Sequence, residues 1–250
     1  MGRAFEYRKA AKMARWGHMS RVFPKLGKLI TIAAKEGGPD PDMNPKLRQA
    51  IQNAKAENMP KDNIDAAIKR ATDKDATNLV EITYEGKGPF GIQCMVECAT
   101  DNTTRTVANV KSYFNKCGGT FLPIGSLEFM FTRKAVFEIE MPAGMEKDDL
   151  ELELIDYGVD EVFEDTEVTK DGEEYKVVVI YGDYTSYGNI QKYIEDNGYE
   201  LVSGGFERIP TVELKDVTPE QRATLDKLTG LLEDDEDVTN VYTTLKPSEE

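Results

Sequence analysis

Histidine and cysteine are scarce in this chain of 250 residues, and each shortage excludes a class of chemistry. His18 is the only histidine, which excludes metal sites built on paired histidines and any Ser-His-Asp triad that does not use His18. The three cysteines are an odd number in a chain without an apolar leader, which indicates reduced thiols. Cys94 and Cys98 fall about 13 Å apart along one expected strand, too far for a disulfide or a shared zinc. We expect them to be small core residues.

Long apolar runs are also missing. No segment approaches the roughly 18 consecutive apolar residues of a membrane-spanning helix. The composition, 40% hydrophobic and 31% charged, is that of a globular protein with real cores, and the length suits one to three domains. We therefore expect a cytoplasmic protein without a membrane partner.

Charge is abundant and unevenly distributed. The formal net charge is −15, yet residues 1–35 contain nine basic residues and one acidic residue, a balance of +8. Because residues 36–74 balance to zero, the remainder carries −23. A basic end on an acidic body indicates contact with a polyanion, and a solvated charged tail is the alternative. The residues expected to contact phosphates are Arg3, Arg8, Lys9, Lys12, Arg15, Arg21, Lys25 and Lys28.

Residues 1–74 predict an all-helical domain, because apolar side chains recur there at spacings of three and four residues. We expect a first helix over residues 4–15 and a second from Pro24, which suits a first-turn position. Asn44-Pro45 and Met59-Pro60 are start signals for two more helices. A polar linker follows at residues 72–78.

After Asn78 the pattern changes to mixed strands and helices. Alternating or continuous apolar runs bounded by turn residues predict strands, and longer periodic segments predict helices. The expected strands are 79–85, 91–99, 126–132, 135–141, 161–166, 175–181, 200–208, 211–215 and 237–243. The expected helices are 102–116, 147–157, 187–197 and 219–232.

This order predicts an α+β fold with one domain inserted in another. Residues 135–208 follow the β-α-β-β-α-β order of a ferredoxin-like unit. The β-α-β fragments on either side form a second such unit when joined, whereas each alone would leave unpaired strand edges. We thus predict an N-terminal helical domain (1–74), then two ferredoxin-like α/β domains, a discontinuous one (79–133 plus 210–245) and an acidic one inserted into it (134–209). Tandem independent domains are the alternative.

Two motifs look functional and are better explained structurally. Residues 86–91 match G-x-G-x-x-G, but a strand follows where a dinucleotide site needs a helix, so a glycine hairpin is expected. The acidic run 233–237 lacks the alternating ligands and the glycine of a calcium loop, which favours a solvated turn. We expect no catalytic residue, cofactor or metal.

Two helix starts carry more polar residues than capping requires. A helix N-terminus attracts anions through its free N–H groups and partial positive charge. We expect both starts to line an interdomain polar surface that receives a phosphate or an RNA end, with Lys61 and Arg105 as its charges. Pairing of Arg105 with a nearby carboxylate is the alternative. The surface would comprise Lys61, Asp62, Asn63, Asp101, Asn102, Thr104 and Arg105.

Several short runs carry a family resemblance, namely 32–38, 44–48, 58–64, 100–102 and 237–242. With them the sequence resembles the YebC family, described as probable transcriptional regulators, whose members include bacterial proteins and a mitochondrial translational activator. The resemblance implies three domains around a central cavity, association with nucleic acid and no known catalysis. The Gly-His-Ser-Lys-Trp opening of many relatives is replaced here by residues 1–9, so its contacts cannot be carried over.

The sequence is compatible with three functions. The first is a non-enzymatic, nucleic-acid-binding regulator of transcription that contacts DNA through its basic helical domain. The second is a ribosome-associated translation factor that contacts ribosomal RNA. The third is a small-molecule sensor with an interdomain ligand cavity. The expected partner is DNA or ribosomal RNA, the latter within the ribosome, and a monomer is the default expectation.

Overall fold

The computed structural model describes residues 19–73, 78–168 and 173–247. Its N-terminal part consists of α2 (Met19–Gly37), α3 (Pro45–Ala56) and α4 (Lys61–Thr72). The helix expected over residues 4–15 lies outside the described residues. The start expected at Pro24 is wrong, because Pro24 lies inside α2 and removes only one of its backbone hydrogen bonds. None of the described helices is both long and apolar enough to cross a membrane.

The three helices pack around one small core, because each has an apolar stripe facing the other two. Asn44 positions α3 against α2. Its side chain accepts a hydrogen bond from the Leu47 N–H (3.1 Å) and donates to the Ala33 carbonyl (2.8 Å). The core residues are Ile30, Ala33, Ala34, Leu47, Ala54, Met59, Ile64 and Ala67.

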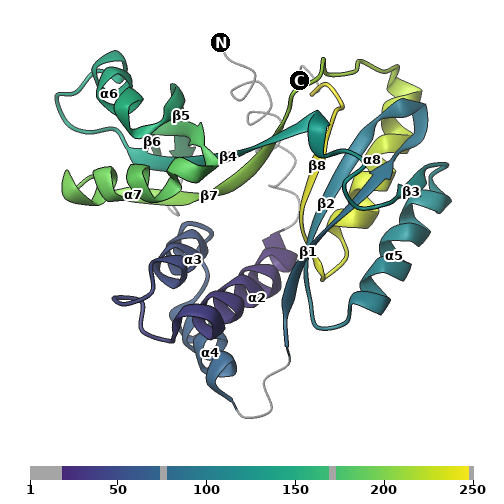
Figure 1. The fold of residues 1–250 in the computed structure, drawn as a ribbon, viewed down its shortest axis with the longest axis horizontal. Coiled ribbons are helices and arrows are strands. Elements are labelled where there is room, and N and C mark those ends of the chain that lie inside the picture. The colour runs from purple at the N-terminus through teal and green to yellow at the C-terminus, as the bar shows by residue number, and fades with distance from the viewer. Residues whose placement is uncertain (1–18, 74–77, 169–172, 248–250) are drawn as a thin grey trace.

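The first sheet has the strand order β3-β1-β2-β8, and all its neighbouring strands are antiparallel (Figure 1). Helices α5 (Thr103–Lys116) and α8 (Pro219–Glu233) pack on one face over a shared apolar core. Gly86 is required there, because a Cβ at this position would lie 2.3 Å from the Phe114 ring. The strands are β1 (Val80–Lys87), β2 (Gln93–Thr100), β3 (Thr120–Leu122) and β8 (Val238–Thr243). The hairpin expected at residues 86–91 is confirmed, since β1 pairs with β2 across it.

Two strands predicted for this sheet are wrong, and the sheet is built differently as a result. Residues 126–130 form a turn and a short 3-10 helix, because the buried Glu85 carboxylate accepts hydrogen bonds from the N–H groups of Gly125 (2.7 Å) and Leu127 (2.6 Å). Residues 211–215 contribute only an isolated bridge between Lys215 and Leu245. The sheet is completed instead by β1, which pairs with β2 on one side and with the short strand β3 on the other.

The second sheet has the order β5-β6-β4-β7 and is also antiparallel. Its chain follows the β-α-β-β-α-β order that the sequence predicts, with helices α6 (Lys147–Leu154) and α7 (Tyr187–Asp196). The strands are β4 (Phe131–Glu140), β5 (Val159–Val168), β6 (Glu174–Asp183) and β7 (Leu201–Pro210). The fold is thus mixed α+β, with a helical N-terminal region and two four-stranded sheets. The predicted domain boundaries themselves stay a prediction.

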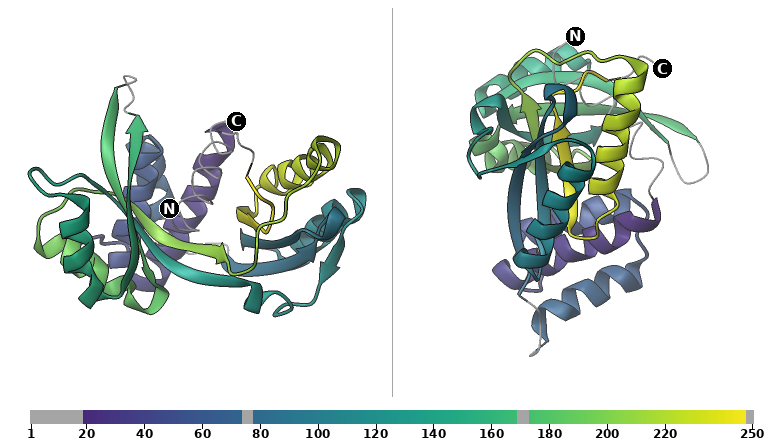
Figure 2. Two further views of the ribbon diagram at one scale, coloured as in Figure 1. Left: turned by 90° about the horizontal axis from the view of Figure 1, so that it is seen from above. Right: turned by 90° about the vertical axis from the view of Figure 1, so that its right-hand side faces the viewer.

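The long strands β4 and β7 run from the second sheet towards the first (Figure 2). The two sheets contact each other through the faces that their own helices leave open. Met95 of β2 and Val136 of β4 point away from those helices, because neighbouring residues of a strand alternate between faces. Both belong to a buried cluster that also includes Phe131, Tyr181 and Tyr242. The Arg208 guanidinium of β7 adds an ion pair with Glu97 of β2 (2.8 Å).

Helix α3 covers part of the open edge of β7. The Asn53 side chain donates to the Gly204 carbonyl (2.6 Å) and accepts from the Gly204 N–H (2.9 Å), much as a neighbouring strand would. Gln52 donates to the Leu201 carbonyl. A Cβ at Gly204 would lie 2.9 Å from the side chains of Gln49 and Phe137, so glycine permits this close approach. The helical region is thereby attached to the second sheet.

Candidate functional site

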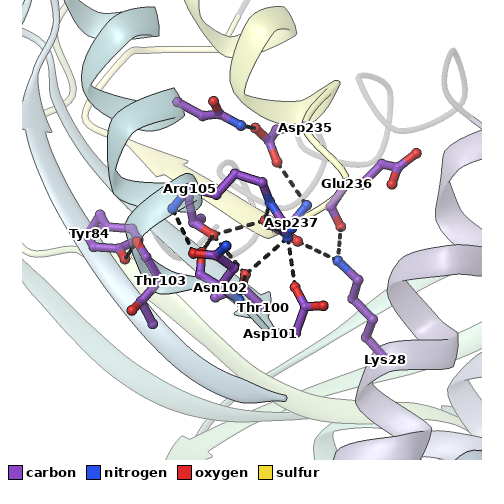
Figure 3. A network of polar contacts seen from close by, with 12 residues as sticks. Lys28, Tyr84, Thr100, Asp101, Asn102, Thr103, Arg105, Asp235, Glu236 and Asp237 are labelled. Carbon is purple, nitrogen blue, oxygen red and sulfur yellow. Dashed lines mark hydrogen bonds and ion pairs between the residues drawn. The ribbon is translucent and has the colours of Figure 1, made fainter. Parts of the chain in front are cut away.

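A polar network joins α2, the start of α5 and the loop between α8 and β8 (Figure 3). Its centre is Asp237, whose side chain is 3% exposed. The carboxylate accepts hydrogen bonds from Lys28 Nζ (2.7 Å), Arg105 Nη2 (2.7 Å) and Thr106 Oγ1 (2.9 Å). Three segments that are far apart in the sequence therefore converge on one buried anion.

Local capping places Arg105 beside Asp237. Asn102 is the N-cap of α5 and its side chain accepts a hydrogen bond from the Arg105 N–H (3.0 Å). The Asn102 N–H in turn donates to Thr100 Oγ1 (2.9 Å). Arg105 also pairs with Asp101 (2.9 Å), while its side chain stays 47% exposed. The guanidinium therefore bridges a buried carboxylate and an exposed one.

Asp237 and Arg105 both stay charged at physiological pH. Burial by itself would raise the pKa of Asp237, but hydrogen bonds from Lys28, Arg105 and Thr106 outweigh it and lower that pKa to about 2. Hydrogen bonds to Asp237 and Asp101 raise the pKa of the Arg105 guanidinium. Since neither group exchanges a proton near pH 7, the network suits fixed electrostatic positioning rather than acid–base chemistry.

Asp235 forms a second, adjoining anchor. Its carboxylate accepts hydrogen bonds from the Tyr113 hydroxyl (2.9 Å), from Asn109 (3.0 Å) and from the Asp237 N–H (2.9 Å). Burial of the Tyr113 hydroxyl and its hydrogen bond to Asp235 raise the pKa of Tyr113 to about 12. The turn expected at residues 233–237 is present between α8 and β8, but its expected solvation is wrong for Asp235 and Asp237, which are buried. One feature of the sequence could have predicted this burial. Thr106, Asn109 and Tyr113 recur at helical spacing on α5, and such a row of polar side chains indicates a polar partner packed against that face.

Two of the predicted phosphate contacts are attached to the same loop. Lys25 Nζ donates to the Glu233 carbonyl (2.6 Å), and Lys28 Nζ donates to the Glu236 carbonyl (2.8 Å) as well as to Asp237. Phosphate binding by Lys25 and Lys28 stays a prediction. Arg21 lies in α2. The others, Arg3, Arg8, Lys9, Lys12 and Arg15, lie outside the described residues.

The two runs of the expected interdomain polar surface have different surroundings. Asp101, Asn102 and Arg105 belong to the Asp237 network, and Thr104 is exposed in the first turn of α5. Lys61, Asp62 and Asn63 are exposed at the start of α4. No hydrogen bond or ion pair joins one run to the other among the residues that the structure describes. The alternative for Arg105, an ion pair with a carboxylate, is present; phosphate binding at this surface stays a prediction.

The cysteines have the role expected of them. Cys94 and Cys98 are free, buried and part of the core of the first sheet. Burial raises the pKa of each of these thiols to about 12, so neither is a thiolate at neutral pH. Cys117 is likewise free and buried in that core.

Comparisons with known proteins give matches over nearly the whole chain. Residues 3–74 match the TACO1/YebC protein N-terminal domain, and residues 79–245 match the TACO1/YebC second and third domain. A relative from Sulfurovum sp. is 58% identical over 98% of this chain and 100% of its own length. A relative from Porphyromonas gingivalis is also 58% identical, over 100% of this chain and 99% of its own length. Both are named "Probable transcriptional regulatory protein".

A solved structure agrees with these matches. The crystal structure of a conserved hypothetical protein from Aquifex aeolicus superposes with a TM-score of 0.73 and 30% sequence identity. The similarity covers 92% of this chain and 91% of that one. The overall α+β fold of this chain is therefore similar to that of an experimentally determined protein.

Proposed function

The chain belongs to the TACO1/YebC family, and from this premise we propose that it is a non-enzymatic, cytoplasmic regulatory protein that binds nucleic acid through its basic N-terminal region. Relatives named as probable transcriptional regulatory proteins support the regulatory class. They also favour DNA as the nucleic acid. Binding to ribosomal RNA, as a ribosome-associated translation factor, is the alternative that the experiments below distinguish.

The observation that carries this proposal is the separation of charge along the chain. Residues 1–35 have a balance of +8, whereas residues 75–250 account for −23. Phosphates attract the first segment through sequence-independent electrostatics and repel the second. A nucleic acid would therefore approach the N-terminal side of α2 and leave the acidic sheets facing away.

The Asp237 network supports this arrangement by fixing α2. Lys25 and Lys28 attach the helix to the α8–β8 loop, and Asn44 and Ala33 attach it to α3. Contacts of Lys25 and Lys28 with phosphates would require them to exchange these partners. We therefore propose that Arg3, Arg8, Lys9, Lys12, Arg15 and Arg21 make the larger contribution to phosphate binding.

Salt dependence tests the electrostatic part of the proposal. Affinity for a short DNA duplex would be measured by fluorescence anisotropy between about 50 and about 200 mM salt. With about five phosphate contacts, log K should fall with log salt at a slope of roughly −4 to −5. The variant Arg8→Ala/Lys9→Ala/Lys12→Ala should reduce the steepness of that slope by roughly 3.

A matched control removes the same charge elsewhere. The variant Lys111→Ala/Lys192→Ala/Lys227→Ala changes three exposed lysines in the acidic part of the chain and should retain the full slope. Binding that does not change with salt would contradict the proposal, as would an equal loss in the control.

Sedimentation distinguishes the two targets. Lysate of cells producing the protein would be treated with DNase and centrifuged through a sucrose gradient. A regulator of transcription should stay near the top of the gradient and protect promoter DNA in a footprint at physiological salt. Comigration with ribosomal subunits that resists DNase would instead establish the translational alternative.

A further inference from the structure

Helix α6 lies at the outer end of the second sheet, away from the first sheet (Figure 1). Large apolar side chains are exposed on and directly after this helix. Leu150 and Leu154 of this helix are fully buried, whereas Leu152 is 68% exposed. Ile155 and Tyr157, directly after the helix, are 56% and 39% exposed. Leu152 and Ile155 are three residues apart and so lie on the same side of the helical turn. A contiguous exposed apolar patch with a polar border is typical of an interaction surface.

A hollow adjoins these side chains. It is lined by the β4–α6 loop, by α6 itself and by Tyr199, with Met145 and Leu152 among its apolar residues. The Tyr199 hydroxyl contacts the Met145 sulfur (3.6 Å). The rings of Tyr157, Tyr193 and Tyr199 form a row with centroid spacings of 4.7 and 6.0 Å. An apolar side chain entering from outside would therefore meet Met145, Leu152 and Tyr199, beside the carboxylates of Asp149 and Glu153, which also line the hollow.

Acidic residues border this apolar area. Asp148, Asp149 and Asp156 are exposed and lie four before, three before and four after Leu152, on its side of the helix. Lys147 is the one basic residue of α6, and it pairs with Asp148 (2.7 Å) and Glu151 (3.1 Å). Among the residues that the structure describes, Asp149 and Asp156 have no ion-pair partner beside these apolar side chains. We call Leu152, Ile155, Tyr157, the hollow and these carboxylates the α6 surface.

We propose that the α6 surface docks a basic protein segment, rich in lysine or arginine, that carries one or more apolar anchor side chains. The anchors fill the hollow beside Leu152, and the cations pair with the bordering aspartates. Nucleic acid would not bind this surface, because the same carboxylates would repel its phosphates. The protein would therefore have two partners of opposite charge. Nucleic acid would bind the basic N-terminal segment, and a basic protein segment would bind the acidic α6 surface.

The charge pattern also argues against the other occupants of an apolar patch. A symmetric dimer through this surface would bring the carboxylates of Asp148, Asp149 and Asp156 from both copies into one interface, where like charges repel. An anionic membrane surface would repel them as well. A basic protein segment is the occupant that both the apolar and the charged parts of the surface favour.

The first test uses synthetic peptides as probes. A short helical peptide of lysine and leucine, with the leucines on one face, would be titrated against the full chain by fluorescence anisotropy. A glutamate and leucine peptide tests the charge, and a lysine and glutamine peptide tests the anchor. The lysine and leucine peptide should bind more tightly than either by at least about tenfold. Equal affinity for the three peptides, or no binding of the first, would overturn the proposal.

The second test changes the surface. Leu152→Ser/Ile155→Ser should weaken binding of the lysine and leucine peptide by at least about tenfold. Asp148→Asn/Asp149→Asn/Asp156→Asn should weaken it and reduce its salt dependence. Because these side chains are exposed, the melting temperature should change little, and affinity for duplex DNA should not fall.

Controls of the same kind lie elsewhere on the chain. Met43→Ser/Phe129→Ser removes two apolar side chains that are 79% and 76% exposed, and Glu213→Gln/Asp216→Asn/Asp226→Asn removes three exposed carboxylates. Both should bind the peptide as the unchanged protein does. If these controls lose as much affinity as the α6 variants, the binding is not at this surface and the proposal is wrong.

Discussion

Asp237 is a buried carboxylate whose partners come from α2 and α5. Asp237→Asn removes the negative charge and leaves Lys28 and Arg105 without a buried counter-charge. We expect the free energy of unfolding to fall by roughly 2–3 kcal/mol, measured by urea denaturation. Asp226→Asn, a substitution of an exposed aspartate on α8, is the control and should change it by less than about 0.5 kcal/mol. Equal stability of the two variants would contradict a stabilising role for the network.

The same carboxylate predicts a pH dependence. Its pKa is about 2 in the folded protein and 3.8 for an ordinary aspartate, so the unfolded chain binds the proton more readily. The stabilisation is therefore complete above about pH 4 and is lost as the pH falls towards about 2, an effect of about 2 kcal/mol. Urea unfolding at several pH values should show the unchanged protein losing more stability over this range than Asp237→Asn. Parallel pH profiles would count against the lowered pKa.

The contact between α3 and β7 depends on one asparagine. Asn53→Ala removes both hydrogen bonds to the Gly204 backbone and leaves that part of the strand edge unpaired. We expect a loss of about 1–3 kcal/mol in the free energy of unfolding and faster hydrogen exchange at the Gly204 amide. Lys55→Ala changes an exposed residue of the same helix and should leave that amide protected. Unchanged exchange in Asn53→Ala would mean that the edge is held by other contacts.

Edges of the second sheet are protected in two different ways. Strand β5 is an edge strand rich in acidic residues, which discourages pairing with another chain. Strand β7 is instead covered by Asn53 and Gln52 of α3, while Tyr242 of β8 contacts the Phe206 carbonyl further along (3.4 Å). Protection of the β7 edge therefore also sets the position of the helical region relative to both sheets.

The expected interdomain polar surface combines two distant helix starts, and substitutions of Lys61 and Arg105 test whether both bind one phosphate. Arg105→Ala should lower the melting temperature, because Asp237 loses an ion pair, whereas Lys61→Ala should leave it unchanged since Lys61 is exposed. If the surface receives a phosphate, Lys61→Ala should weaken binding of duplex DNA or a ribosomal RNA hairpin at unchanged stability. The double variant should weaken it further. Full affinity in Lys61→Ala would remove this residue from the surface, and full affinity in the double variant would remove the surface altogether.

Local patterns were enough to predict most elements of this protein. Apolar spacing identified α3, α4 and the two helices of each sheet, and alternating or continuous apolar runs identified β2, β4, β6 and β7, because these patterns depend on residues one to four positions apart. Asn102 could be recognised as a cap for the same reason, since its partner Arg105 is three residues away. The family resemblance also rested on short runs of this kind, and it is confirmed by the matches over residues 3–74 and 79–245.

Long-range neighbours were decided only in the folded chain. Strand β1 lies between β2 and β3 in the sheet. Its own sequence is compatible with pairing to several other strands, so its neighbours are decided only when the strands pair in the folded chain. Burial of Asp237 depends on Arg105 and Lys28, which are 132 and 209 residues away along the chain. An acidic run has the same local pattern whether its carboxylates face water or buried cations. Only the packing of α2, α5 and α8 around it brings those cations within hydrogen-bonding distance and makes two of its aspartates structural.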